Sequence, residues 1–128
     1  MSARVTPRYP GLTLRILAGE GPAMGPGRAR LVALIASTGS ISAAAREMGM
    51  SYRRAWQLVD ALNASFSEPL VKTVVGGQRG GGAIVTEFGQ RVVEDYHRME
   101  SKASAAIASD LKHYATHLRK RASKSRSR

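Results

Sequence analysis

The chain has 128 residues, of which 43% are hydrophobic, and a formal net charge of +11. This length accommodates one domain with one hydrophobic core. The absence of cysteine excludes disulfides, thiolate metal sites and thiol catalysis, and no run approaches the roughly 18 apolar residues of a membrane-spanning helix. Because the N-terminus also lacks the continuous apolar segment of a signal peptide, we expect a cytoplasmic protein.

The basic surplus is unevenly distributed along the chain. The last ten residues, 119–128, carry six Lys or Arg side chains and no acid, which leaves a net charge of +5 on the remaining 118 residues. We therefore predict a folded part over residues 1–118 and a basic flexible tail over 119–128. An excess of this size is typical of proteins that bind nucleic acid, an anionic membrane surface or an acidic protein, and it does not choose among them.

The N-terminal part predicts a strand hairpin followed by a helix. Residues 12–17 are rich in strand formers, and their apolar side chains alternate at period two. Glycines and a proline then end the strand, and a short extended piece at Ala23 and Met24 completes the hairpin. Pro26 suits the first turn of a helix, which we expect to end near Gly39.

The middle of the chain shows the pattern of a helix-turn-helix. Ser40 or Ser42 can cap a short helix, and Gly49 suits the left-handed residue that ends it. Ser51 is a natural cap for a second helix, which we expect over residues 52–63. A short helix, a glycine-containing turn and a second helix define this motif. Small residues let the two helix axes approach each other, and the candidates are Ala44, Ala45 and Ala55.

On a helical wheel the second helix has an apolar face and a polar face. Ala55, Val59 and Leu62 point inward, whereas Arg53 and Gln57 lie on the opposite side. Side chains of these types reach base edges in the major groove and the phosphates beside it. The residues expected to contact DNA from this helix and its cap are Ser51, Tyr52, Arg53, Arg54, Trp56 and Gln57. The alternative is a solvated surface for the arginines and a place in the core for the tryptophan.

Two strands joined by a glycine-rich loop predict a wing. Residues 70–75 and 83–86 are strand-like, and the loop between them is GGQRGGG. This loop lacks the GxxxxGK(S/T) spacing of a phosphate-binding loop and leads into a strand rather than a helix, which argues against nucleotide binding. Glycine lets the backbone approach DNA phosphates, and a merely flexible turn is the alternative. The residues expected to contact the DNA backbone or minor groove are Arg79, Gly80 and Gly81.

An apolar stripe with steps of three or four residues predicts one long helix over residues 87–118, capped by Thr86. Such a helix spans roughly 45 Å at ~1.5 Å per residue, which exceeds what a domain of this size needs for its own core. We therefore expect the stripe to pack against a second copy of the chain; beyond residue 110, a frayed end is the alternative. The residues assigned to this dimer interface are Phe88, Val92, Tyr96, Met99, Ile107 and Leu111.

No catalytic or metal-binding constellation is recognisable in the sequence. His113 and His117 are four residues apart, but no third ligand accompanies them at a useful spacing, so we interpret them as surface side chains. No nucleophile is placed with a general base and an acid. The chain is therefore predicted not to be an enzyme and to require no metal and no other cofactor.

These motifs resemble the N-terminal DNA-binding domain of the ModE molybdate-responsive transcriptional regulators. The resemblance runs from Gly25 to Met99 and rests on GPGRARLVALI, TGSISAAAREMGMSYRRAW and VVGGQRGGGAIVTEFGQR. The strand LTLRIL also lies where that family begins its domain. LysR-type regulators share the helix-turn-helix portion, but SYRRAW and the glycine-rich wing favour ModE.

The resemblance implies a winged helix that dimerises through the N-terminal strand region, the first helix and the long helix. It adds Leu14 and Ile16 to the predicted interface and matches Ser51 to Arg54 with the start of the recognition helix. Full-length ModE proteins carry a C-terminal molybdate-binding region of paired small β-barrels, whereas this chain ends at Arg128 with a basic tail. We therefore expect no molybdate-binding region here, and a partner protein or a full-length relative is the candidate source of any signal.

Together these features predict a mainly α protein with small β elements, an α+β winged helix-turn-helix. Its parts are the helix-turn-helix over 40–63, the wing over 70–86 and the long helix over 87–118. We expect a homodimeric, nucleoid-associated transcription regulator that binds a roughly palindromic duplex site sequence-specifically; a link to molybdenum-related genes rests on the resemblance. Two alternatives stay open, namely a sequence-neutral architectural protein that coats DNA and an adaptor that uses the winged helix to bind protein.

Overall fold

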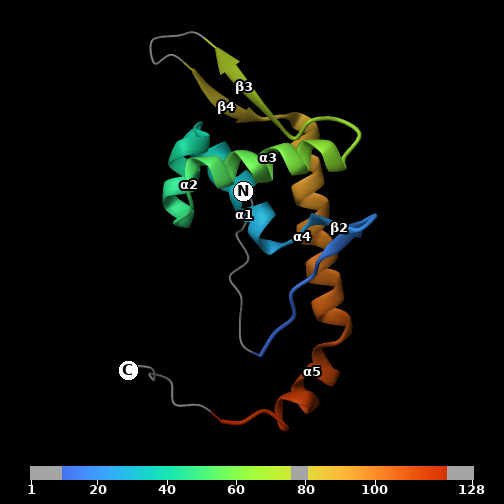
Figure 1. The fold of residues 1–128 in the computed structure, drawn as a ribbon. Coiled ribbons are helices and arrows are strands. Elements are labelled where there is room, and N and C mark those ends of the chain that lie inside the picture. Colours follow the sequence, from blue (N-terminus) through green and yellow to red (C-terminus); the bar gives the residue numbers. More distant parts are fainter. Residues whose placement is uncertain (1–9, 76–80, 121–128) are drawn as a thin grey trace.

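The computed structural model describes residues 10–75 and 81–120. In chain order its elements are β1 (Ile16–Ala18), β2 (Gly21–Met24), α1 (Pro26–Thr38), α2 (Ile41–Met48), α3 (Tyr52–Ser65), β3 (Val71–Val75), β4 (Gly81–Val85), α4 (Glu87–Ala106) and α5 (Ala108–Ala115). Figure 1 shows α1, α2 and α3 gathered beside α4, with the β3–β4 hairpin projecting at one end and α5 lying at the other. The predicted α+β winged helix-turn-helix is confirmed.

The helix boundaries follow from local capping. The Ser40 hydroxyl accepts a hydrogen bond from the Ala43 N–H at 3.0 Å, so Ser40 rather than Ser42 caps α2. Gly49 ends that helix with a φ of 70°. The Ser51 hydroxyl accepts a hydrogen bond from the Arg54 N–H at 3.0 Å and caps the start of α3. This helix runs to Ser65, two residues beyond the expected end at residue 63.

The core lies where the three short helices meet β2, the start of β3 and the middle of α4. The alanines predicted at the crossing of α2 and α3 are at most 2% exposed, which is what a close approach of two helix axes requires. The largest fully buried side chains are Met24, Leu31, Ile35, Val59, Leu62, Leu70 and Tyr96.

The N-terminal hairpin is shorter than the sequence pattern predicts. β1 and β2 pair antiparallel, with an irregular register between Ile16 and Leu17, and residues 10–15, the described residues before β1, form no ladder. The carbonyl of Leu14 instead accepts a hydrogen bond from the Tyr96 hydroxyl at 2.7 Å. A side chain of α4 therefore satisfies a backbone group that a longer strand would have paired.

The helix predicted over 87–118 is divided into α4 and α5 at Ile107, whose φ and ψ are −109° and 14°. Hydrogen bonds still cross this residue: its N–H donates to the Ala103 carbonyl at 3.2 Å, and its carbonyl accepts from Leu111 at 2.7 Å. No residue of α5 is buried within the described chain. Packing against a core supplies most of the stability of a protein helix. Since α5 lacks such packing, nothing in the described chain favours its continuing α4 as one straight helix.

The first turn of α4 packs closely on Leu70, the residue before β3, and we expect this contact to require glycine at position 89. A Cβ added to Gly89 would lie 2.5 Å from the Leu70 oxygen and 3.0 Å from the Val85 Cγ1. We expect Gly89→Ala to lower the free energy of unfolding by about 1–3 kcal/mol, measured by urea denaturation. Gly27→Ala is the matched control, because Gly27 lies in α1 with nothing within 4 Å of its added Cβ; there alanine should leave stability equal or higher. Equal stability of the two variants would contradict the packing argument.

Candidate nucleic-acid interface

The helix α3 has the two faces that the helical wheel predicts. Its apolar side is buried, since Ala55, Val59 and Leu62 are at most 1% exposed. The predicted contact residues are distributed over the other side. Ser51, Tyr52, Arg53, Arg54 and Gln57 are exposed, and Trp56 is half-buried. The first two turns of α3 therefore present two guanidinium groups, an amide and a phenol to solvent.

The arginines of α3 are not neutralised within the described part of the chain. The two ion pairs found there both lie on α4, between His97 and Glu100 and between Asp95 and Arg98. On α1, burial and then the positive charge of Arg54 lower the pKa of Arg28, and one terminal nitrogen of Arg28 is buried with no partner among the described residues. Two uncompensated guanidiniums at the start of α3 create a positive potential that attracts an anion.

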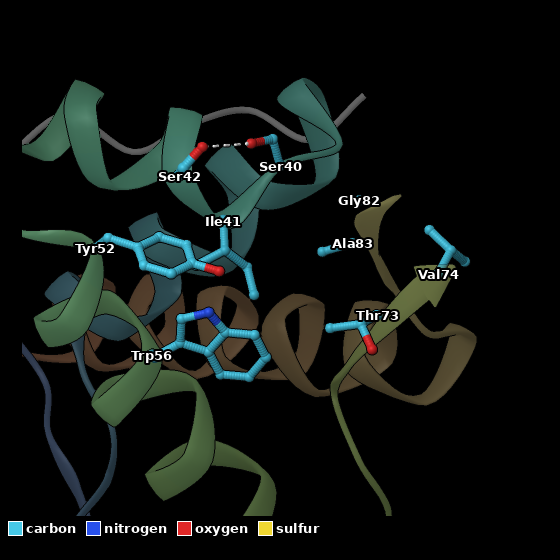
Figure 2. A pocket seen from close by; sticks show the side chains of 9 residues that line it. All are labelled: Ser40, Ile41, Ser42, Tyr52, Trp56, Thr73, Val74, Gly82 and Ala83. Atoms are coloured by element: carbon cyan, nitrogen blue, oxygen red, sulfur yellow. Dashed lines mark hydrogen bonds between the residues drawn. The ribbon is translucent and has the colours of Figure 1, made fainter. Parts of the chain in front are cut away.

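An open groove of about 280 Å³ runs between α3, the start of α2 and the wing (Figure 2). The rings of Tyr52 and Trp56 contact each other edge to face, with centroids 6.3 Å apart and planes at 84°. Trp56 also packs against the core, as the alternative interpretation expects, and its contact with DNA stays a prediction. The residues that line the groove are Ser40, Ile41, Ser42, Tyr52, Trp56, Thr73, Val74, Gly82 and Ala83.

The wing is attached to the end of α1 by its backbone. The Ala83 N–H donates to the Gly39 carbonyl at 2.9 Å. A Cβ on Gly82 would lie 2.7 Å from the same oxygen, so only glycine permits this approach. Of the wing residues predicted to contact DNA, Gly81 begins β4 opposite Val75, whereas Arg79 and Gly80 lie outside the described residues.

Asn63 connects α3 to the wing and was not identified from the sequence. Its side-chain N–H donates to the Val71 carbonyl at 3.0 Å, and its side-chain oxygen accepts from the backbone N–H groups of Leu70 (2.8 Å) and Val71 (3.2 Å). Three hydrogen bonds thus connect the last turns of α3 to the first strand of the wing. The sequence pattern around Asn63 does not predict this contact, because the backbone groups that it binds belong to a different element, the start of β3.

The residues predicted at a dimer interface fall into two groups. Leu14, Ile16, Phe88 and Val92 are half-buried and pack against this chain's own core, and Tyr96 is only 1% exposed. The ring of Tyr96 is therefore enclosed by its own chain and does not form part of the accessible stripe. Further along, Met99 is 43% exposed, and Ile107 and Leu111 are half-buried.

The described residues contain no cluster of three or more His, Asp or Glu side chains that could hold a metal ion. His113 and His117 contact each other edge to face with ring centroids 5.3 Å apart. None of the helices described has both the length and the apolarity that crossing a membrane demands.

A tri-helical body whose second and third helices form a helix-turn-helix, followed by a β-hairpin beside the third helix, defines the winged helix-turn-helix proteins. Residues 27–90 match the family of bacterial regulatory helix-turn-helix proteins of the lysR type, and the chain belongs to this family. Membership in a family of regulators agrees with the prediction that the chain is not an enzyme.

Relatives at 36–43% identity carry the names ModE, MopA and MopB. The chain is 42% identical over 94 residues to the molybdenum-pterin-binding protein MopB of Rhodobacter capsulatus, a match covering 73% of this chain and 35% of the relative. It is 39% identical over 87 residues to the molybdenum transport protein ModE of Azotobacter vinelandii (68% and 32%). For the DNA-binding transcriptional dual regulator ModE of Escherichia coli K12 the identity is 36% over 88 residues (66% and 34%). The predicted resemblance to the N-terminal domain of ModE-type regulators is thereby confirmed, and the chain spans about a third of the length of these relatives.

Removing the Asn63 side chain should loosen the wing from α3. Asn63→Ala leaves two buried or half-buried backbone N–H groups without their partner, so we expect the free energy of unfolding to fall by about 1–3 kcal/mol. Amide hydrogen exchange should show the largest loss of protection at Leu70 and Val71. The control is Ser65→Ala, which removes an exposed hydrogen bond to the Ala61 carbonyl in the same helix and should change stability by less than about 0.5 kcal/mol. Unchanged exchange at the start of β3 would refute this role.

Proposed function

We propose that this protein is a transcription regulator that binds double-stranded DNA sequence-specifically, with α3 in the major groove. One observation carries the proposal: the exposed first turn of α3 bears Arg53 and Arg54, neither of them in an ion pair within the described chain. A helix of this kind fits the major groove, where arginine donates to guanine and to phosphates. The wing lies beside α3 and would contact the backbone or the minor groove.

The names of the relatives support a connection to molybdenum. They include a molybdenum transport protein, a molybdenum-pterin-binding protein and a DNA-binding transcriptional regulator. We propose that the sites bound by this chain control genes related to molybdenum, that the protein acts on the chromosome in the cytoplasm, and that DNA binding by the winged helix itself uses no metal or cofactor. Any signal would then come from a partner protein or a full-length relative.

Exposed apolar side chains on the second half of α4 and beyond it support a homodimer on a roughly palindromic site. Met99 is 43% exposed, and Tyr114 and Leu118 are exposed further along, so a second copy of the chain would cover apolar surface there. In such a dimer the two α3 helices would enter major grooves one or more helical turns apart, each turn being about 34 Å.

Selection from a random duplex library at ~150 mM salt, with the full chain, tests the sequence-specific proposal. We expect an inverted repeat, which Arg53→Ala should degrade at one or two base positions per half-site if the guanidinium contacts a base. Arg91→Ala is the matched control, because it removes an exposed arginine from α4 and should recover the same motif. DNA retained without any motif would replace the proposal by sequence-neutral architectural binding. Specific binding that survives loss of both Arg53 and Arg54 would overturn the placement of α3.

An acidic side chain on the exposed stripe should weaken the dimer. We expect the wild type to sediment as a dimer at micromolar concentration and Met99→Asp to shift toward monomer, because dimerisation would bury the new charge. Ser101→Asp is the control: it adds the same charge at an exposed position on the opposite side of α4. A wild type that sediments as a monomer would remove the argument for paired half-sites.

A further inference from the structure

The first two turns of α3 carry a pair of aromatic rings in addition to the arginines. Tyr52 is 54% exposed although it is large and partly apolar, and its ring meets that of Trp56 one turn later. Figure 2 shows both rings turned toward the same space, with Ile41 close to them and Thr73 and Ala83 of the wing opposite. Tyrosine and tryptophan, each of which combines an apolar ring with a polar end, are enriched at binding interfaces.

Each ring combines an apolar face with a free polar end. Among the described residues, neither the Tyr52 hydroxyl nor the Trp56 indole N–H forms a hydrogen bond, whereas the Ser40 and Ser42 hydroxyls at the groove's rim are bonded to each other at 3.2 Å. The Ser40 hydroxyl is also occupied as the cap of α2. On the α3 side of this groove, the donors without a partner among the described residues are therefore the Tyr52 hydroxyl and the Trp56 indole N–H.

Thymine has the edge that fits this pair. In the major groove it presents the only apolar group on any base, the C5-methyl, directly beside the O4 acceptor. Cytosine presents an amino donor in place of O4 and no methyl, so it would oppose a donor with a donor. An aromatic face that ends in an O–H or N–H donor is complementary to the thymine edge in both respects.

We propose that Tyr52 and Trp56 form a thymine-recognition site, in which the rings pack on the C5-methyl and one of their donors bonds to O4. This inference rests on the proposed major-groove placement of α3 and goes beyond it by naming the base. The DNA backbone is the less suitable occupant, because no lysine or arginine of the described residues lines the groove, whereas Ile41, Trp56, Val74 and Ala83 give it apolar surface that a phosphate cannot use.

Replacing thymine by deoxyuridine isolates the methyl group, since uracil keeps the same pairing and the same O4. In the site recovered by selection, each thymine is replaced in turn, and Kd is measured with the full chain. We expect one or two positions per half-site at which Kd rises about fourfold, the effect of one buried methyl group. Thymines flanking the protected region are the matched control positions and should show no change.

Tyr52→Ala connects this effect to the proposed site, and folding is not at risk because Tyr52 is exposed. At the sensitive positions, deoxyuridine should no longer change Kd for this variant, whereas Tyr52→Phe should keep the effect because it keeps the ring. Comparing Tyr52→Phe with Trp56→Phe, which preserves an aromatic ring against the core, identifies the donor: the variant that lacks it loses its preference for uracil over cytosine at that position.

The outcomes separate this inference from the function on which it rests. If no motif emerges from selection, sequence-specific binding fails, and recognition of thymine fails with it. If a motif emerges but no deoxyuridine substitution matters, the regulator stands and the thymine site is overturned. A deoxyuridine effect that persists in Tyr52→Ala shows that Tyr52 does not contact the methyl group, so the two rings do not form the site together. Equal weakening of all duplexes by Tyr52→Ala, with no methyl effect, assigns the pair to the DNA backbone; both results overturn the proposal.

Discussion

The relative placement of the helix-turn-helix and the wing depends on the backbone of one residue, Gly39. With a φ of 73°, it ends α1 and turns the chain so that Ser40 can cap α2 at the next position. Its carbonyl accepts the Ala83 N–H, and the missing side chain of Gly82 leaves room for that oxygen. The end of one helix, the start of another and the second strand of the wing thus meet at a single peptide group. A side chain at Gly39 would strain the turn, and one at Gly82 would displace the wing.

A second attachment joins the wing to the three-helix body. Asn63 of α3 binds the backbone at the start of β3, while Gly39 at the end of α1 binds β4, so each strand of the hairpin is hydrogen-bonded to a different helix end. The wing, which forms one wall of the groove, is therefore anchored to the body that forms the other wall. Recognition elements that are held by buried backbone contacts lose little further freedom on binding, which favours specificity over adaptable contact.

Local rules explain why much of the helix-turn-helix could be predicted from the sequence. Capping by Ser51, the left-handed Gly49 and the burial of Val59 depend on residues within one or two turns of each other, so periodicity and residue type suffice. The hydrogen bonds of Asn63, the burial of Tyr96 in its own core and the break at Ile107 depend on elements far apart in the sequence or on the absence of packing. The same limit applies to the interface residues: exposure and residue type place Arg53 and Gln57 on an accessible face, and their contacts with DNA remain predictions.

Charge and shape have separate roles in the proposed complex. The net charge of +11 attracts any polyanion. This attraction weakens steeply as the salt concentration rises, because the release of counterions from the DNA then contributes less free energy. Aromatic packing on a methyl group involves no counterion, so its contribution to discrimination is independent of salt. Raising salt therefore removes affinity for all DNA alike and leaves the difference between a matched and a mismatched base largely intact. Tyr52, Arg53 and Arg54 are all exposed on one helical turn. In the proposed complex, general attraction by the arginines would therefore bring to the DNA the same surface that distinguishes among sequences.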